Sequence, residues 1–165
     1  MLHRSLYPAD LPDLDLIQTH CYSASMLESA DVFDSRLRAA PDWIWGIQDD
    51  EGLCAYLFTY PVHQGHLSPL NSGFHPAPDG DTLYLHDLAI HPRGRGHGLA
   101  HRLIRHAWDH ARSAGLRHSA LISVQDSERF WAAQGYRTCT DLNDQQHACL
   151  ASYAQPARYM TRTLA

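Results

Sequence analysis

The stretch HPRGRGHGLA, residues 91–100, places three alternating glycines among two arginines and two histidines. It follows the apolar run TLYLHDLAI (82–90), which reads as a β-strand. It leads into LAHRLIRHAWDHARSAG (99–115), whose apolar residues recur at helical spacing: Leu99, Leu103, Ala107 and Ala111. A glycine turn between a strand and a helix presents backbone N–H groups at the positive end of the helix dipole, which favours an anion. The stretch therefore predicts a phosphate-binding loop.

Two arginines strengthen this prediction, and other phosphate-binding motifs are absent. Arg93 and Arg95 can pair with phosphate oxygens in a forked geometry. The sequence contains no lysine, which excludes the lysine-dependent Walker loop. The loop lacks the G-x-G-x-x-G spacing and no acidic residue ends the following strand, so a nicotinamide cofactor is disfavoured.

Length and composition indicate the size and setting of the protein. A chain of 165 residues with 44% hydrophobic content suffices for one well-cored domain, which we expect to span residues 1–165. No apolar run approaches the roughly 20 residues of a membrane span, and the N-terminus does not read as an export signal. We therefore expect a cytoplasmic protein that does not act at a membrane. The sequence contains no C-x-x-C pair, so it indicates neither a zinc knuckle nor a dithiol redox site. The four cysteines are Cys21, Cys54, Cys139 and Cys149.

Charge is distributed unevenly along the chain. Residues 1–90 carry 3 Arg against 13 Asp and Glu, whereas residues 91–165 carry 10 Arg against 5. This asymmetry suits a half that faces an anionic ligand and a half that attracts a cationic one; an arginine-rich helix opposite an acidic surface is the alternative. The acidic half and the absence of a basic N-terminal arm argue against a nucleic-acid partner.

The rest of the chain reads as alternating helices and strands. Asp10 can cap a helix through about His20, and Ser29 can cap a second through Ala39. Residues 61–80 read as a long loop. The other expected elements are the strands DWIWGIQ (42–48), LCAYLFTY (53–60), RHSALISV (117–124), YRTCT (136–140) and ARYMTRTL (157–164), and the short helix DSERFWAAQG (126–135).

Two segments carry a resemblance to a known family. Arg93-x-x-Gly96-x-Gly98 resembles the R/Q-x-x-G-x-G/A pyrophosphate loop of the GNAT superfamily of N-acetyltransferases, and SERFWAAQGY (127–136) resembles the family's A-x-x-F-Y-x-x-x-G-F element. The resemblance extends over nearly the whole chain. It implies an α/β (α+β) fold of one domain, with a mixed sheet of about six or seven strands split into a V and flanked by about four helices.

The resemblance also implies acetyl-CoA as cosubstrate, with pantetheine inserted between the strand ending at Ile90 and the strand beginning near His118. A backbone N–H near Leu88 would then meet the thioester oxygen and stabilise the oxyanion that develops as an amine attacks. The cofactor contacts expected on this basis are Leu88, Ala89, Ile90, Arg93, Gly94, Arg95, Gly96, His97, Gly98, Leu99, Ser127, Phe130 and Trp131.

An attacking amine must lose a proton, and the strand at 82–90 offers the candidate bases. Strand alternation places Tyr84 and His86 on one face and Asp87 on the other, unless a bulge changes the parity. His86 titrates near neutrality and is the first choice; Asp87 is the second, as a base or as a carboxylate that orients a histidine. LHDLAIHP also resembles the corresponding strand of the arylalkylamine acetyltransferases, which have a histidine at the position of His86 and a second where this chain has Tyr84.

The leaving thiolate presents a second departure from the family pattern. Its usual acid is the tyrosine of the F-Y pair, but this chain has Phe130 and Trp131. Tyr136 and Tyr153 are available in the sequence, although neither hydroxyl can be placed at the sulfur from the sequence alone. Ser127 can either reach the cofactor or cap its helix.

The thirteen histidines raise the question of a metal site. His97 with His101, and His106 with His110, are i, i+4 pairs, but neither carries the glutamate of an H-E-x-x-H motif. We expect no metal and a solvated helix face.

Three functions are consistent with these residues. The first is direct transfer of an acetyl group from acetyl-CoA to a primary amine in a ternary complex. A small amine is the expected acceptor, aromatic amines included, with Tyr22, Phe33 and Trp45 near it. The alternatives are acetylation of a protein or peptide amine and a non-catalytic acyl-CoA-binding module. The sequence leaves both a monomer and a homodimer open.

Overall fold

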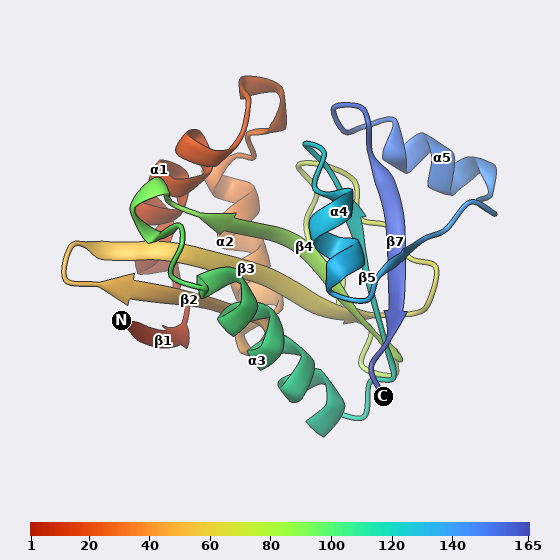
Figure 1. The fold of residues 1–165 in the computed structure, drawn as a ribbon, viewed down its shortest axis with the longest axis horizontal. Helices are drawn as coiled ribbons and strands as arrows, with labels where there is room; N and C mark the ends of the chain where they lie inside the picture. The colour runs from red at the N-terminus through yellow and green to blue at the C-terminus, as the bar shows by residue number, and fades with distance from the viewer.

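A mixed β-sheet of seven strands runs through the molecule (Figure 1). The computed structural model describes residues 1–165. The strands are β1 (Leu2–Ser5), β2 (Ile44–Asp49), β3 (Gly52–Val62), β4 (Thr82–Ile90), β5 (His118–Ser123), β6 (Arg137–Thr138) and β7 (Arg158–Thr163). Their order is β1-β2-β3-β4-β5-β7-β6; β4 and β5 pair in parallel, and all other neighbours are antiparallel. The expected mixed sheet is confirmed.

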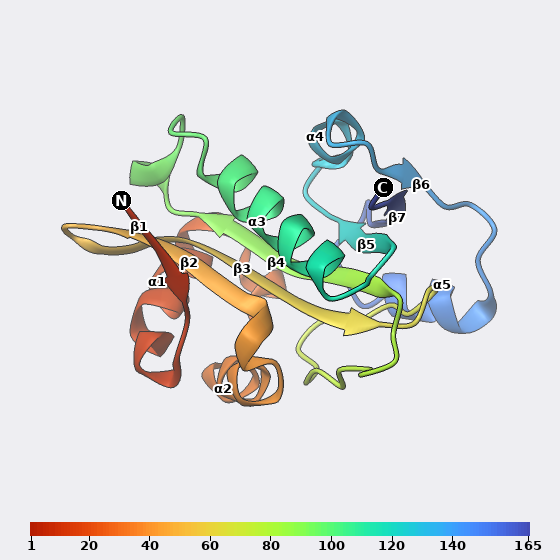
Figure 2. The ribbon, with the colours of Figure 1, turned by 90° about the horizontal axis from the view of Figure 1, so that it is seen from below.

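Five α-helices accompany the sheet, one more than expected. They are α1 (Leu11–Cys21), α2 (Ala30–Ala39), α3 (Leu99–Ser113), α4 (Glu128–Ala133) and α5 (Asp144–Leu150), with 3₁₀ turns η1 (Pro8–Asp10), η2 (Ala24–Met26), η3 (Pro41–Trp43) and η4 (Pro92–Gly94). Figure 2 shows α1 and α2 on one face of the sheet and α3 on the other. Each face carries its own buried cluster, of 22 and 18 residues respectively. None of these helices has both the length and the apolar character needed to cross a bilayer.

Local signals explain most element boundaries. Ser29 Oγ accepts a hydrogen bond from Val32 N at 3.2 Å and caps α2, as expected. The helix expected to start at Asp10 is present, but the Asp10 carboxylate accepts from Tyr7 N and so caps the preceding turn η1 instead. Gly115 ends α3 with φ +85°.

The bulge considered in the sequence is present and changes the predicted faces of β4. The register between β3 and β4 shifts after the Phe58–Asp87 pair and resumes at Thr59–Leu85, which leaves His86 unpaired. The extra residue turns His86 and Asp87 to the same face, that of α1 and α2. The prediction that these two side chains point to opposite faces is therefore wrong.

The sheet opens into a V between β4 and β5. The two strands pair only from Thr82–His118 to Leu85–Leu121, and beyond these pairs they separate. The backbone of residues 86–90 thus lacks a partner on the β5 side. This opening positions the candidate site.

Candidate active site

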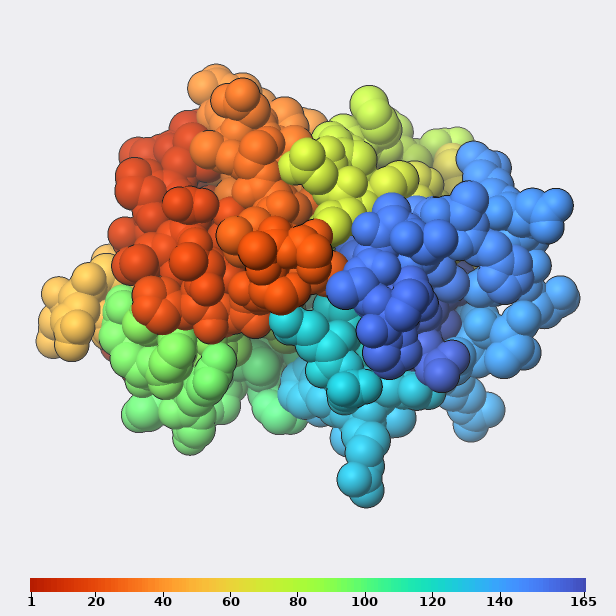
Figure 3. Space-filling view, turned by 90° about the horizontal axis from the view of Figure 1, so that it is seen from above, coloured from red at the N-terminus to blue at the C-terminus, as the bar shows by residue number.

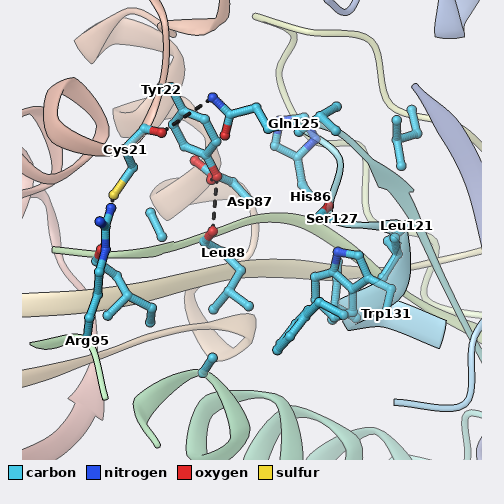
Figure 4. A pocket seen from close by; sticks show the side chains of 17 residues that line it. Cys21, Tyr22, His86, Asp87, Leu88, Arg95, Leu121, Gln125, Ser127 and Trp131 are labelled. Carbon is cyan, nitrogen blue, oxygen red and sulfur yellow. Dashed lines mark hydrogen bonds between the residues drawn. The ribbon is translucent and has the colours of Figure 1, made fainter. Parts of the chain in front are cut away.

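A cavity of about 360 Å³ occupies the opening between β4 and β5 (Figure 4). Its walls are residues 85–90 of β4, the end of β5 and the turn after it, α4 with Ser127 before it, the end of α1 with Tyr22, and Arg95 and Ala100 around the start of α3. The cavity brings together these expected site residues: His86, Asp87, Leu88, Ala89, Ile90, Arg95, Ser127, Phe130 and Trp131. Tyr84 does not line it; the Tyr84 side chain is buried, and its hydroxyl accepts from Ser68 N at 3.2 Å.

The glycine loop lies next to this cavity, between β4 and α3. Gly96 and Gly98 have φ +78° and +70°, and a Cβ at either position would meet no atom within 4 Å. Glycine is therefore required at both positions by the backbone conformation and not by packing. Gly94 differs, because a Cβ there would lie 3.0 Å from Leu99 Cδ1. The first amides of α3 have no preceding turn to bond and are available to an anion.

The two loop arginines have different surroundings. Arg93 pairs with Asp49 (Nε to Oδ2, 3.0 Å) and donates to Leu53 O at 2.8 Å, so its guanidinium holds the β2–β3 hairpin. Arg95 lines the cavity, with its guanidinium beside the thiol of Cys21 (Figure 4). The predicted phosphate contacts of both arginines stay a prediction, with the difference that Arg93 already has a carboxylate partner.

Asp87 is a buried carboxylate held by two tyrosines. The Tyr22 hydroxyl lies 2.6 Å from Asp87 Oδ1, and the Tyr56 hydroxyl donates to Oδ2 at 2.9 Å. Burial and the nearby charge of Glu28 raise the pKa of Asp87 to about 6, although the tyrosine hydrogen bonds oppose the shift. Asp87 is thus suited to exchange a proton near neutral pH.

A buried ion pair adjoins His86. Glu28 accepts two hydrogen bonds from Arg36, at 2.8 and 2.5 Å, and both of its oxygens lie 3.2 Å from His86 Nε2. Burial opposes ionisation of Glu28, but the hydrogen bonds from Arg36 and His86 prevail and hold its pKa well below the ordinary value. Burial and Arg36 lower the pKa of His86 despite Glu28. Because a carboxylate only accepts, His86 Nε2 carries the proton, and the buried Nδ1 has no partner.

The sequence did not reveal Glu28, Arg36 or the Tyr22–Asp87 bond. Glu28 precedes the predicted cap Ser29 and Arg36 lies near the end of the predicted helix, positions where charged side chains are usually solvated. Two of the aromatic residues expected near the acceptor lie in the core instead: Phe33 in the cluster under α1 and α2, and Trp45 in the cluster under α3.

Trp131 packs where the family pattern has a tyrosine. It is 8% exposed, lines the cavity, and meets Phe130 and Tyr136 at ring distances of 5.0 and 5.5 Å. Tyr136 bonds Ser119, and Tyr153 donates to Ser68 O, so both hydroxyls are engaged elsewhere. Ser127 does not cap α4; its hydroxyl bonds Ser123 Oγ at 3.0 Å.

The helix histidines have aromatic neighbours. His106 packs edge-on against Trp45 at 4.8 Å, and His110 packs against Trp43 at 4.6 Å. The expected solvated face is thus partly an aromatic contact between α3 and the segment formed by η3 and β2. The structure brings together no group of three His, Cys, Asp and Glu side chains suited to a metal ion.

The model of the acetyltransferase (GNAT) family matches residues 8–136, more than half of the chain. The chain belongs to this family. The expected family and fold are confirmed. The finer resemblance to arylalkylamine acetyltransferases is not shown.

Individual relatives are distant. L-2,4-diaminobutyric acid acetyltransferase of Vibrio parahaemolyticus is 26% identical over 70 residues, which are 42% of this chain and 39% of that protein. The match thus spans well under half the length of this curated relative.

Solved structures share the fold over the whole chain. The GphF GNAT-like decarboxylase in complex with isobutyryl-CoA has a TM-score of 0.80 at 15% identity, with 100% of both chains covered. N-acetylglutamate synthase from Neisseria gonorrhoeae, complexed with coenzyme A and N-acetyl-glutamate, has a TM-score of 0.71 at 16% identity, covering 99% of this chain and 35% of that one.

Proposed function

We propose that the protein transfers the acetyl group of acetyl-CoA directly to a small primary amine. One arrangement carries this proposal: the cavity between β4 and β5 has the glycine loop beside it and Asp87 in its wall. Asp87 is a buried carboxylate with a raised pKa. The family and the acetyltransferase named above support it.

The open strand edge and the loop would hold the cosubstrate. Residues 88–90 have backbone groups without a β5 partner, which suit the amides of pantetheine. The glycine-loop amides and Arg95 would contact the phosphates, together with the opening turn of α3. Arg93 would act indirectly by fixing the hairpin against the loop.

Asp87 would take the proton that the amine nitrogen sheds. With a pKa of about 6 it is ionised at neutral pH, yet close enough to neutrality to release the proton again. His86, the first choice from the sequence, also lines the cavity, but its Nε2 faces Glu28 and its Nδ1 is buried. We therefore assign to His86 a structural role, as the part of the cavity wall that hydrogen-bonds Glu28 of the Glu28–Arg36 pair.

The enclosure beyond Asp87 favours a small acceptor over a protein. Three distant segments, around residues 20–30, 65–75 and 150–155, meet on one face of the molecule (Figure 3). Hydrogen bonds join them: Asn71 N donates to Glu28 Oε2, Leu70 N to Ser152 Oγ, and Tyr153 Oη to Ser68 O. The remaining void there is about 30 Å³, so an acceptor would have to reach Asp87 through the cavity of about 360 Å³ between β4 and β5.

Release of free thiol from acetyl-CoA in the presence of individual amines tests the proposal. The panel includes diamino acids, aromatic amines and polyamines, with N-terminal peptides as the comparison, and calorimetry measures CoA binding separately. We expect CoA to bind and small amines to be acetylated faster than peptides. If CoA binds but no amine in the panel causes release of thiol from acetyl-CoA, the protein is an acyl-CoA-binding module. Faster reaction with peptides than with small amines would indicate a protein acceptor.

A further inference from the structure

Transfer to an amine leaves CoA as a thiolate, and α4 supplies no acid to protonate it. An indole N–H does not give up a proton near neutral pH, so Trp131 cannot do so. The hydroxyls of Tyr136 and Tyr153 are bonded away from the cavity. Some other group in the cavity wall must deliver the proton, or water must.

Tyr22, directly after α1, is the only tyrosine that lines the cavity. Its hydroxyl lies 2.6 Å from Asp87 Oδ1 and 3.0 Å from Leu88 O (Figure 4). It therefore touches both the proposed proton acceptor and the open edge of β4. The side chain comes from the residue after α1, on the opposite side of the cavity from Trp131 on α4 (Figure 4).

The other polar side chains around the cavity lack this connection. The Cys21 thiol donates to Ile90 O at 3.2 Å, the Ser127 hydroxyl bonds Ser123, and Gln125 Nε2 reaches Cys21 O. None of them bonds Asp87. Tyr56 does bond Asp87, but it is fully buried and does not line the cavity.

We propose, on the basis of the function proposed above, that Tyr22 and Asp87 form a proton relay in which Tyr22 protonates the departing thiolate. The neutral amine attacks the thioester carbon, the C–N bond forms, and the C–S electron pair leaves on sulfur. The nitrogen's proton passes to Asp87, the Tyr22 proton passes to sulfur, and the Asp87 proton passes to the Tyr22 oxygen. The products are an amide and a thiol, with both side chains in their starting states.

The relay is favourable because no free tyrosinate has to form. Burial, with the adjacent Asp87 charge, raises the pKa of Tyr22 far above its ordinary value, so Tyr22 alone is a weak acid. When protonated Asp87 replaces the proton in the same step, the net transfer runs from a carboxylic acid to a thiolate whose conjugate acid has a pKa of about 8.5, which is downhill. The 2.6 Å contact provides the path.

Tyr22→Phe and Tyr56→Phe form a matched pair, because each removes one hydroxyl from Asp87 and only the first removes one from the cavity. With acetyl-CoA and a saturating amine, we expect Tyr22→Phe to lower kcat by about 10²-fold. Tyr56→Phe should lower kcat by less than about tenfold, because the Tyr56 hydroxyl only positions Asp87. Calorimetry with CoA should show unchanged affinity in both variants.

A second thioester separates acid delivery from positioning. The 4-nitrophenyl thioester of acetic acid releases a thiol far more acidic than CoA, so the deficit of Tyr22→Phe should shrink several-fold with this substrate. An equal deficit with both thioesters, or wild-type kcat in Tyr22→Phe with acetyl-CoA, would overturn the relay. Wild-type protein that acetylates no amine would overturn the proposed function and the relay with it.

Discussion

The loop beside the cavity and the buried cluster in its wall differ in how they are assembled. The glycine loop comes from one contiguous stretch, residues 93–99, and its groups for binding are mainly backbone amides fixed by two residues of positive φ. The buried cluster consists of side chains from several distant segments: Tyr22, Glu28, Arg36, His86 and Asp87. Binding of the cosubstrate can therefore rest on local conformation, whereas the proposed proton transfer depends on tertiary contacts.

The same contrast appears in the electrostatics. Around the loop, charges are partly exposed, as in the Arg93–Asp49 pair, where both side chains are 23% exposed. In the cluster, Glu28 and Arg36 are 4% and 0% exposed and determine each other's environment. A substitution in the cluster should thus have effects beyond the residue changed, and one in the loop should not.

The largest expected effect is on the reaction, from Asp87→Asn. Removing the proposed base should lower kcat by about 10²- to 10⁴-fold. In the wild type, kcat/KM should rise with pH through about 6 as Asp87 ionises, and this rise should be absent in the variant. Steady-state thiol release from pH 5 to 8 measures both.

His86→Gln is the comparison for Asp87→Asn. Glutamine can still donate to Glu28 but cannot act as an imidazole base, so we expect it to keep kcat within about tenfold of the wild type. Loss of activity in His86→Gln together with wild-type kcat in Asp87→Asn would make the histidine the base, as the sequence alone favoured.

The next effect is on stability, from Arg36→Met. The variant leaves Glu28 buried without its cation, which should cost about 3–5 kcal/mol in the free energy of unfolding. Arg38→Met, two residues along the same helix, removes a pair whose arginine is 68% exposed and should leave the free energy of unfolding nearly unchanged. Urea denaturation of both variants provides the measurement, and equal losses would contradict the assignment of a buried ion pair.

The deficit of Arg36→Met has a predictable dependence on pH. Arg36 lowers the pKa of Glu28 below its ordinary value of 4.5. The pair therefore contributes its full stabilisation of the folded state above pH 4.5, and this stabilisation is lost as the pH falls through the lowered pKa. Without Arg36, burial favours the neutral carboxylic acid. The stability difference between wild type and variant should therefore be largest near pH 7 and narrow toward pH 4.

The loop was predictable from sequence because its signal is local. Residues 91–100 contain the glycines, the arginines and the helix start in one segment, and the family resemblance added the pairing of strands on either side. The same locality explains β4 and α3, whose strong periodicity marked their positions. Two elements were missed: β1 has only four residues, and α5, with seven, lacks the family motif that marked the six-residue α4.

The cluster was not predictable for two physical reasons. A strand pattern gives alternation but not the bulge at His86, and this single unpaired residue brings His86 and Asp87 to one face. Burial of Glu28 and Arg36 depends on the loop at 63–81, whose Asn71 N and Ser72 O complete their hydrogen bonds. A sequence gives no measure of such a contact between distant segments.

A smaller effect, on affinity alone, is expected from Gly96→Asp at the loop. The carboxylate would stand in the open space beside the helix N-terminus and repel phosphate, so CoA affinity should fall by at least about tenfold. Gly115→Asp is the control, since Gly115 also has positive φ and open space but lies at the other end of α3. Calorimetry that finds the same CoA affinity in Gly96→Asp and wild type would contradict the loop assignment.

The smallest effect is expected from Trp131→Phe, in the cavity wall between the loop and the cluster. If Trp131 serves only to pack against Phe130 and Tyr136, phenylalanine keeps most of the apolar contact and loses some area. We expect kcat to stay within about threefold of the wild type and stability to fall by about 1 kcal/mol, because the indole supplies no proton in the proposed reaction. Thiol release and thermal unfolding measure the two quantities. Complete loss of activity with intact CoA affinity would require a specific role for the indole N–H, and would place part of the chemistry on α4 instead of on Tyr22 and Asp87.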